Sequence, residues 1–292
     1  MLKARLEIHF SVLLWGFTAI LGELITLNAL PLVWWRMLLV GATLLSLRRV
    51  RRTLRAMSPR LLAAYAGIGI IVSLHWLTFY SAVKLANASV AATCIALAPV
   101  FLAFIEPVLA QRRLDMRELV LGLAVIPGVA LVVDGVPSGM RLGVALGITS
   151  AVLVAVFGSL NKRLVQHADP LAITGLELGA GAIFLGFLAP WLPHSGAALP
   201  LPDLHDALLL LILAYACTML PFTLSLNALR HLSAFSVQMV INLEPVYAIT
   251  LAILILHEQH QLDVKFYAGV VLILGAVFAQ PLLWRSHQEA RS

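Results

Sequence analysis

Ten apolar runs occupy most of this 292-residue chain. Each is about long enough to cross a lipid bilayer as a helix, which takes roughly 20 residues. The runs show no strict alternation of apolar and polar residues, so they predict helices and not strands. They lie at about 6–26, 31–47, 61–83, 88–109, 118–135, 141–160, 170–191, 205–229, 233–256 and 264–284. The sequence therefore predicts an all-α polytopic membrane protein with ten transmembrane helices.

The composition points to lipid as the main solvent of the chain. Hydrophobic residues make up 61% of it and charged residues 12%, with a mean hydropathy of +0.96. A soluble domain carries about 25% charged residues. The net charge of +6 comes from arginines in the loops, which indicates membrane topology and no nucleic-acid partner. Cys94 and Cys217 lie inside apolar runs without metal-ligand spacing, so we expect no metal and no cofactor.

The distribution of Lys and Arg predicts the orientation in the membrane. With a cytoplasmic N-terminus, 16 of these residues fall on the cytoplasmic side, and Arg36 lies within the second run. Only Lys84, Arg141 and Lys265 fall outside. The positive-inside rule then places both termini in the cytoplasm and the 191–205 loop in the periplasm of a bacterial inner membrane.

An internal repeat with an offset of 146 residues divides the chain. Pro99–Phe101 matches Pro245–Tyr247, and a Gly-x5-Gly spacing that begins at Gly122 returns at Gly269. The sequence therefore predicts two homologous halves, 1–137 and 138–292, with five helices each. Because five is odd, the second half enters from the opposite side. Such inverted repeats are typical of secondary transporters.

A polar stretch in the ninth run is the best candidate for substrate contact. Gln238 and Asn242 are four residues apart and share a helix face. Two neutral amides can bind the ammonium and carboxylate groups of an amino acid. The alternative is that they hydrogen-bond neighbouring helices. Pro99 and Pro245 occupy equivalent positions in the two halves and are candidate helix hinges, because proline removes a helix hydrogen bond.

Two charged residues inside the runs are candidate charge or proton sites. Glu244 lies about 200° around the helix from Asn242, so it does not join the amide face. It is a proton site, the partner of Arg36, or a group at the membrane edge. Arg36 is a candidate for binding a substrate carboxylate. Its alternative is that the long side chain snorkels to the membrane surface.

The third run carries an aromatic candidate site. His75 and Phe79 form one stripe, with Trp76 and Tyr80 beside it. A membrane histidine often lines a water-filled path, and aromatic rings suit an apolar side chain or a cationic group. Packing between helices is the alternative. Thr18 and Tyr215 complete the predicted substrate-binding set. Further polar positions with weaker claims are Thr93, Asn161 and Glu177, and tryptophans such as Trp15 mostly lie near run ends, as in an aromatic belt.

Several motifs resemble one transporter family over essentially the whole chain. They are Trp15-Gly16, Arg36, Ala-Pro-Val-Phe at 98–101, Leu-Glu-Pro-Val-Tyr at 243–247, and Glu258 before a glycine-spaced helix. Together they resemble the EamA-type transporters of the drug/metabolite transporter superfamily. The resemblance implies two five-helix halves around a central cavity. It also implies amino acid export, as in the aromatic amino acid and threonine/homoserine exporters. Arg112 departs from this pattern, because a glutamate often stands there.

The chain lacks the motifs of catalysis. It has no Gly-x-Ser-x-Gly, no His-Glu-x-x-His and no phosphate-binding loop, so no catalytic residue is expected. We predict an inner-membrane secondary transporter that exports amino acids, aromatic or otherwise neutral, or related small metabolites by alternating access. The alternatives are a transporter of a different metabolite or drug and, from other classes, an intramembrane enzyme or a receptor. Its partners would be the substrate and the bilayer, as a monomer or weak homodimer.

Overall fold

The computed structural model describes residues 2–110, 116–192, 196–232, 237, 240–241 and 243–288. Within these ranges the chain is helical and contains no strand. Seven helices are long and apolar enough to cross a membrane. Three shorter apolar helices lie at Ala124–Asp134, Glu244–Leu256 and Val264–Ala276, which brings the number of crossings to ten. The predicted all-α polytopic membrane fold is confirmed.

The first half contains five crossings and one short basic helix. Its crossings are α1 (Leu2–Leu24), α2 (Ala29–Ser46), α4 (Pro59–Leu85), the pair α5 (Ala88–Ile95) and α6 (Ala98–Ala110), and α7 (Met116–Asp134). The basic helix α3 (Arg48–Arg55) connects α2 to α4. The fourth crossing is therefore interrupted between α5 and α6.

The second half repeats this plan. Its crossings are α8 (Arg141–Leu164), α9 (Pro170–Leu188), the series α10 (Leu204–Leu211), η4 (Ile212–Met219) and α11 (Leu220–His231), the pair α13 (Glu244–Leu251) and η5 (Ala252–Leu256), and α14 (Val264–Gln288). Four short 3-10 turns join or extend them: η1 (Ser138–Met140), η2 (Val165–His167), η3 (Ala189–Trp191) and η6 (Glu258–His260). The segments η4 and η5 are π-helical, a geometry that occurs frequently at functional sites.

Polar residues before several helices define where those helices begin. The Asn87 side chain accepts a hydrogen bond from Val90 N at 2.9 Å at the start of α5. Asp169 and Asp203 cap α9 and α10 in the same way. Such caps satisfy backbone N–H groups that have no partner within the helix. Capping of these N–H groups is more important in a membrane, since lipid offers no hydrogen-bond acceptor in place of water.

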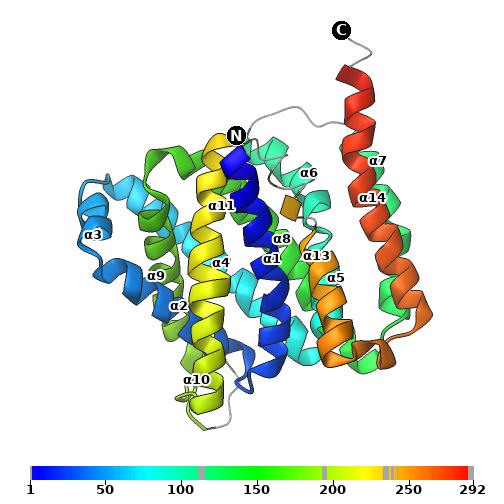
Figure 1. The fold of residues 1–292 in the computed structure, drawn as a ribbon, viewed down its shortest axis with the longest axis horizontal. Coiled ribbons are helices and arrows are strands. Elements are labelled where there is room, and N and C mark those ends of the chain that lie inside the picture. Colours follow the sequence, from blue (N-terminus) through cyan, green and yellow to red (C-terminus); the bar gives the residue numbers. More distant parts are fainter. Residues whose placement is uncertain are drawn as a thin grey trace.

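Glycines allow the closest helix contacts. A Cβ atom on Gly41 of α2 would lie 2.9 Å from the Cα atom of Gly179 of α9. One on Gly128 of α7 would lie 3.0 Å from the carbonyl oxygen of Gly269 of α14. Small residues let helix backbones approach in lipid, where hydrophobic attraction between helices is absent. In Figure 1, α7 and α14 pair at one edge of the bundle.

The two halves run in opposite directions. The first turn of α1 and the last turn of α14 lie at the same end of the bundle, called here the termini face (Figure 1). At the opposite end, the far face, Lys265 Nζ donates to Asp134 Oδ2 at 2.6 Å and joins the start of α14 to the end of α7. Because α8 follows α7, it starts at the far face, whereas α1 starts at the termini face. The repeat is inverted.

Candidate functional site

A cavity of about 130 Å³ lies between the two halves. A single water needs roughly 10–15 Å³ of such space, so the cavity suits a small metabolite. Its walls come from α1, α2, α4 and the α5–α6 break in the first half, and from α8, α11 and the ninth crossing in the second. This is the interface of the repeats, where secondary transporters place their substrate sites.

Arg36 supplies a fixed positive charge to the cavity. Its side chain is buried, with 2% of the residue exposed. Nη1 donates to Tyr80 Oη at 2.8 Å, and Nε donates to Thr218 Oγ1. The guanidinium carbon lies 3.9 Å from the ring centroid of Trp76, which is a cation–π contact. The alternative that Arg36 snorkels to the membrane surface is therefore wrong, because tertiary contacts hold it inside.

The π-helix η4 positions the partners of Arg36 on the second half. Thr218 Oγ1 donates to the carbonyl of Leu213, five residues earlier, at 2.6 Å. The carbonyl of Cys217 lies 3.5 Å from Arg36 Nη2. The wide turn of a π-helix thus directs a hydroxyl and a main-chain oxygen toward a helix of the other half.

Glu244 supplies a carboxyl group to the same cavity. It is the first residue of α13 and is half-buried. Within the part of the chain that the structure describes, its carboxylate has no hydrogen-bond donor, and no nitrogen of Arg36 lies within 4.0 Å of it. Glu244 is therefore not the direct ion-pair partner of Arg36. Within the described residues, the cavity wall thus carries a guanidinium group and a carboxyl group that do not pair with each other.

Aromatic rings and His75 form the rest of the cavity wall. His75 Nδ1 lies 2.7 Å from Ser150 Oγ of α8 and 3.1 Å from the Ser150 carbonyl oxygen. Its ring packs against Phe157, with centroids 5.3 Å apart. Trp76 meets Phe222 edge to face, with centroids 6.2 Å apart. The site is mostly apolar with a few directed polar groups, as is usual for small-molecule sites.

The structure brings together six of the predicted site residues. Those that line the cavity are Thr18, Arg36, His75, Trp76, Phe79 and Glu244. Tyr80 lies behind Arg36, where its hydroxyl also donates to the Thr18 carbonyl at 3.3 Å. Tyr215 is not part of the wall; its hydroxyl lies 2.9 Å from Thr43 Oγ1.

Gln238 and Asn242 lie outside the described residues, so their contact with substrate stays a prediction. The residues that precede them in the sequence, Val237 and Ile241, both line the cavity. The ninth crossing thus contributes to the wall as the sequence indicated, whatever the role of its two amides.

Both predicted hinge prolines lie at helix breaks. Pro99 is the second residue of α6 and Pro245 the second residue of α13. At such positions proline loses no intrahelical hydrogen bond, because the first N–H groups of a helix lack partners anyway. Ile95 and Ala98, on either side of the first break, line the cavity. The prolines therefore start new helix segments beside the cavity, and their role as hinges stays a prediction.

Several wall residues escaped the sequence analysis. Trp15 lines the cavity and is not part of an interfacial belt. No sequence pattern distinguished Phe157, Phe222 or Ser225, since an isolated aromatic residue or serine is common in membrane helices. One signal existed for Phe222: it is the equivalent of Trp76 at the repeat offset of 146, and such pairs can meet at the axis between repeats.

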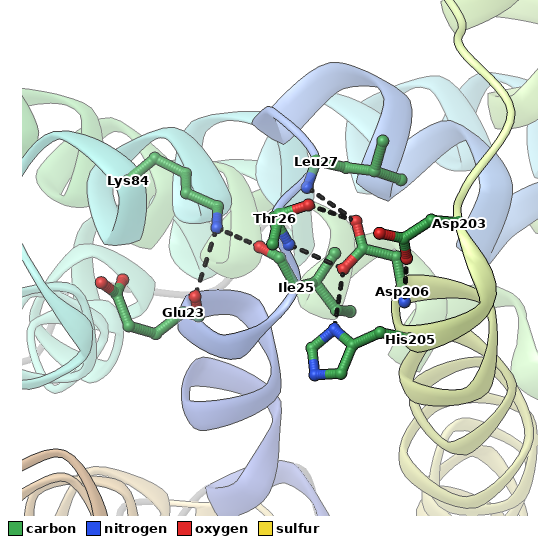
Figure 2. A network of polar contacts seen from close by, with 8 residues as sticks. All are labelled: Glu23, Ile25, Thr26, Leu27, Lys84, Asp203, His205 and Asp206. Carbon is green, nitrogen blue, oxygen red and sulfur yellow. Dashed lines mark hydrogen bonds and ion pairs between the residues drawn. The ribbon is translucent and has the colours of Figure 1, made fainter.

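Polar contacts close the molecule at the far face, as Figure 2 shows. Asp206 of α10 accepts hydrogen bonds from Thr26 N at 2.8 Å, Thr26 Oγ1 at 2.7 Å and Leu27 N at 3.1 Å. Lys84 donates to the carbonyl of Ile25 in the same turn. The Asp206 contacts tie the turn between α1 and α2 to the second half, and the Lys84 contact ties it to α4.

Glu258 makes a second contact between the halves at this face. It is buried, and its two oxygens accept from Ala88 N at 2.9 Å and Ser89 N at 2.8 Å at the start of α5. A carboxylate at a helix N-terminus satisfies free N–H groups and complements the helix dipole. His257, with φ 54°, adopts the left-handed conformation that is uncommon for a non-glycine residue. We call Asp206 and Glu258 with these partners the far-face seal.

The cavity extends from mid-depth toward the termini face. Asn161 near the end of α8, Leu229 near the end of α11 and Val237 all belong to its wall. On that side Lys162 Nζ donates to the carbonyls of Leu229 and Leu232 at 2.9 and 3.0 Å. The residues of the cavity wall thus lie at mid-depth and toward the termini face, and Thr26, Asp206 and Glu258 of the far-face seal are not among them.

Comparison with known proteins identifies the architecture. A profile of the EamA-like transporter family matches residues 6–134 and again residues 141–279. An uncharacterized transporter from Methanothermobacter thermautotrophicus is 29% identical over 141 residues, which are 45% of this chain and 40% of that protein. The match therefore spans about two fifths of the length of this curated relative. A solved crystal structure superimposes with a TM-score of 0.63 at 18% identity, over 97% of this chain and 98% of the other, and shows the shared fold.

Proposed function

Because this chain belongs to the EamA-like transporter family, we propose that it exports amino acids, aromatic or otherwise neutral, or related small metabolites across a bacterial inner membrane by alternating access. One observation carries the substrate class. Arg36 and Glu244 present opposite charges to one cavity without pairing with each other. A zwitterionic amino acid carries the complementary pair of charges at its head.

Arg36 has donors left for a substrate carboxylate. A guanidinium group carries five N–H donors. Three of them are used by Tyr80, Thr218 and, weakly, the Cys217 carbonyl. At least one remains on each terminal nitrogen, the arrangement that binds a carboxylate through two bonds. Glu244 accepts the ammonium group, and the rings of Trp76, Phe79 and Phe222 surround the side chain.

The asymmetry between the two faces supports alternating access. The far-face seal closes one side while the cavity extends toward the other. With the termini in the cytoplasm, as the Lys and Arg distribution predicts, this is the conformation that loads substrate for export. Release then requires that the seal break and that the termini face close.

A set of three ligands tests the substrate class. Purified protein is titrated with a neutral aromatic amino acid, with the acid that lacks its amino group and with the amine that lacks its carboxylate. Loss of one hydrogen bond to a charged group costs about 1.5 to 3 kcal/mol, so each truncated ligand should bind roughly ten- to a hundredfold more weakly. Equal binding of all three ligands would contradict a zwitterion site. Efflux of the amino acid from loaded liposomes then tests transport.

The aromatic wall supports a second candidate, export of an apolar cation such as a drug. Trp15, Trp76 and Phe157 offer π faces, and Glu244 supplies a counter-charge. In that case the amine without a carboxylate should bind at least as tightly as the amino acid. The three-ligand titration therefore separates the two candidates.

A further inference from the structure

A buried carboxyl group lies beside the cavity. Glu177 of α9 is 0% exposed, and Asn161 of α8 is 2% exposed. Asn161 Nδ2 lies 3.3 Å from Glu177 Oε2 and donates to it. The other oxygen of each side chain, Glu177 Oε1 and Asn161 Oδ1, is buried without a hydrogen-bond partner. The Glu177–Asn161 pair thus shares one hydrogen bond and leaves one buried oxygen of each side chain without a partner.

Within the part of the chain that the structure describes, no charged side chain forms an ion pair or a hydrogen bond with Glu177. The titratable residue that faces it is Tyr65 of α4, whose hydroxyl donates instead to the Leu164 carbonyl at 2.7 Å. Cations on the helices around it have other partners: Arg36 of α2 donates to Tyr80, Arg49 of α3 pairs with Asp169, and Lys162 of α8 donates to backbone carbonyls.

An ionised carboxylate at this position would be energetically unfavourable. An unpaired buried acceptor has lost its hydrogen bonds to water without replacement, and a charge in the middle of a membrane is strongly unfavourable. On the α4 side the helices pack closely, because a Cβ atom on Gly69 would overlap with the carbonyl oxygen of Glu177. A neutral carboxylic acid removes the charge and turns Oε1 from an acceptor into a donor.

We propose that Glu177 is protonated in this conformation and that it is the site that couples proton import to substrate export. A proton on Oε1 pairs with Asn161 Oδ1 after a small rotation of the amide, while Asn161 Nδ2 keeps its bond to Oε2. Carboxylic acid and primary amide then form two hydrogen bonds, and one proton satisfies both unpartnered oxygens. This inference rests on the proposed transport function.

Asn161 connects the proton to the cavity because it belongs to the cavity wall. When substrate and water enter from the termini face, they compete for the Asn161 amide and weaken its pair with Glu177. The carboxyl group then releases its proton to cavity water at that face. After the cavity opens at the far face and substrate leaves, the carboxylate takes up one proton there. The cycle moves one proton inward for each substrate exported.

Liposome assays of Glu177→Gln test the coupling. Glutamine keeps a hydrogen-bonding amide beside Asn161 but carries no exchangeable acid proton. We expect substrate exchange without a pH gradient to persist, accumulation driven by a pH gradient to be lost, and substrate-induced proton release, followed with a pH dye, to disappear. Glu23→Gln is the matched control, because Glu23 is exposed at the end of α1 at the far face. This variant should show the same pH-driven substrate accumulation and the same substrate-induced proton release as the wild type.

Infrared spectroscopy tests the protonation itself without a transport assay. The wild type at neutral pH should show a carboxylic acid C=O band that is absent from Glu177→Gln. If that variant does not fold, Asn161→Leu serves instead, because loss of the amide partner should shift the band to higher frequency.

The outcomes separate the two proposals. If wild type and Glu177→Gln accumulate substrate equally under a pH gradient, the coupling role is overturned while the transport function stands. If the wild type moves no amino acid in either assay, the transport function fails, and the infrared band still decides whether Glu177 holds a proton. Absence of a band that depends on Glu177 or Asn161 overturns the protonation.

Discussion

Arg36 and Glu244 face one cavity from opposite halves of the protein, yet no Arg36 nitrogen lies within 4.0 Å of a Glu244 oxygen. Arg36 is held by Tyr80 and Thr218, whereas the carboxylate of Glu244 has no partner within the described part of the chain. A direct ion pair would neutralise both groups. Their separation leaves each charge available to a ligand, although each also destabilises the empty site.

Substitution of these two charges should change affinity in different ways. Arg36→Lys keeps the charge but loses the planar group that lies over Trp76 and bonds Tyr80. We expect it to weaken binding of an amino acid roughly ten- to a hundredfold. Glu244→Gln should weaken binding of the amino acid by a similar factor but leave the affinity for the deaminated acid unchanged. Titration of both ligands measures this, with Glu23→Gln as control. Unchanged amino acid affinity in Glu244→Gln would remove Glu244 from the site.

Asp206→Asn should loosen the far-face seal. Asp206 accepts three hydrogen bonds from Thr26 and Leu27, and loss of a charged acceptor costs about 1.5 to 3 kcal/mol. The population open to the far face should rise roughly ten- to a hundredfold. A cysteine at Thr18, in the cavity wall, should then react faster with a membrane-impermeant reagent added at that face.

Asp203→Asn is the matched control for the seal. Asp203 caps α10 by accepting a hydrogen bond from Asp206 N at 2.8 Å, and among the described residues no hydrogen bond joins it to the first half. Its removal should leave labelling of the cavity cysteine unchanged. Equal acceleration by both variants would indicate general loosening of α10 and not release of a seal.

Replacement of Pro99 or Pro245 by alanine should slow transport more than it weakens binding. Each proline begins a helix segment beside the cavity, and alanine permits a continuous, stiffer helix through the break. Efflux rates from liposomes and equilibrium titrations give the two quantities. Wild-type efflux in both alanine variants would show that the breaks are static.

Gln238→Leu and Asn242→Leu test the amides of the ninth crossing. If they contact the substrate, each variant should lose affinity by roughly ten- to a hundredfold while it still folds, because leucine suits lipid at least as well as an amide. Binding and thermal stability are measured on the same preparations. Normal binding by unstable protein would instead assign both amides to helix packing.

Cysteine labelling tests the orientation in the membrane. Both native cysteines are buried, so they contribute little background. In intact cells an impermeant reagent should modify Leu201→Cys, at an 82% exposed position of the far face, and spare Arg52→Cys in α3. The reverse pattern would place the termini outside and reverse the proposed direction of export.

Part of the site could be predicted from local spacing. The i,i+4 stripe of His75 and Phe79, with Trp76 beside it, was identified because residues on one face of a helix share their surroundings. Arg36 and Glu244 stood out because a charge inside an apolar run is rare. Trp15, Phe157 and Phe222 were not identified, since an aromatic residue in a membrane helix has the same local signature whether it faces lipid, protein or a cavity.

The sequence alone determined the number of crossings, the duplication and the inverted arrangement of the halves. These follow from run length, repeat offset and the parity of five helices, and bilayer thickness sets the length of each crossing. Only the tertiary structure decided that Arg36 is buried over Trp76, that Glu244 does not pair with it, and that Asp206 and Glu258 of one half hold backbone N–H groups of the other. The contacts of Asp206 and Glu258 join residues 180 and 170 positions apart. They depend on helix rotation and packing, which leave no periodic pattern in the sequence.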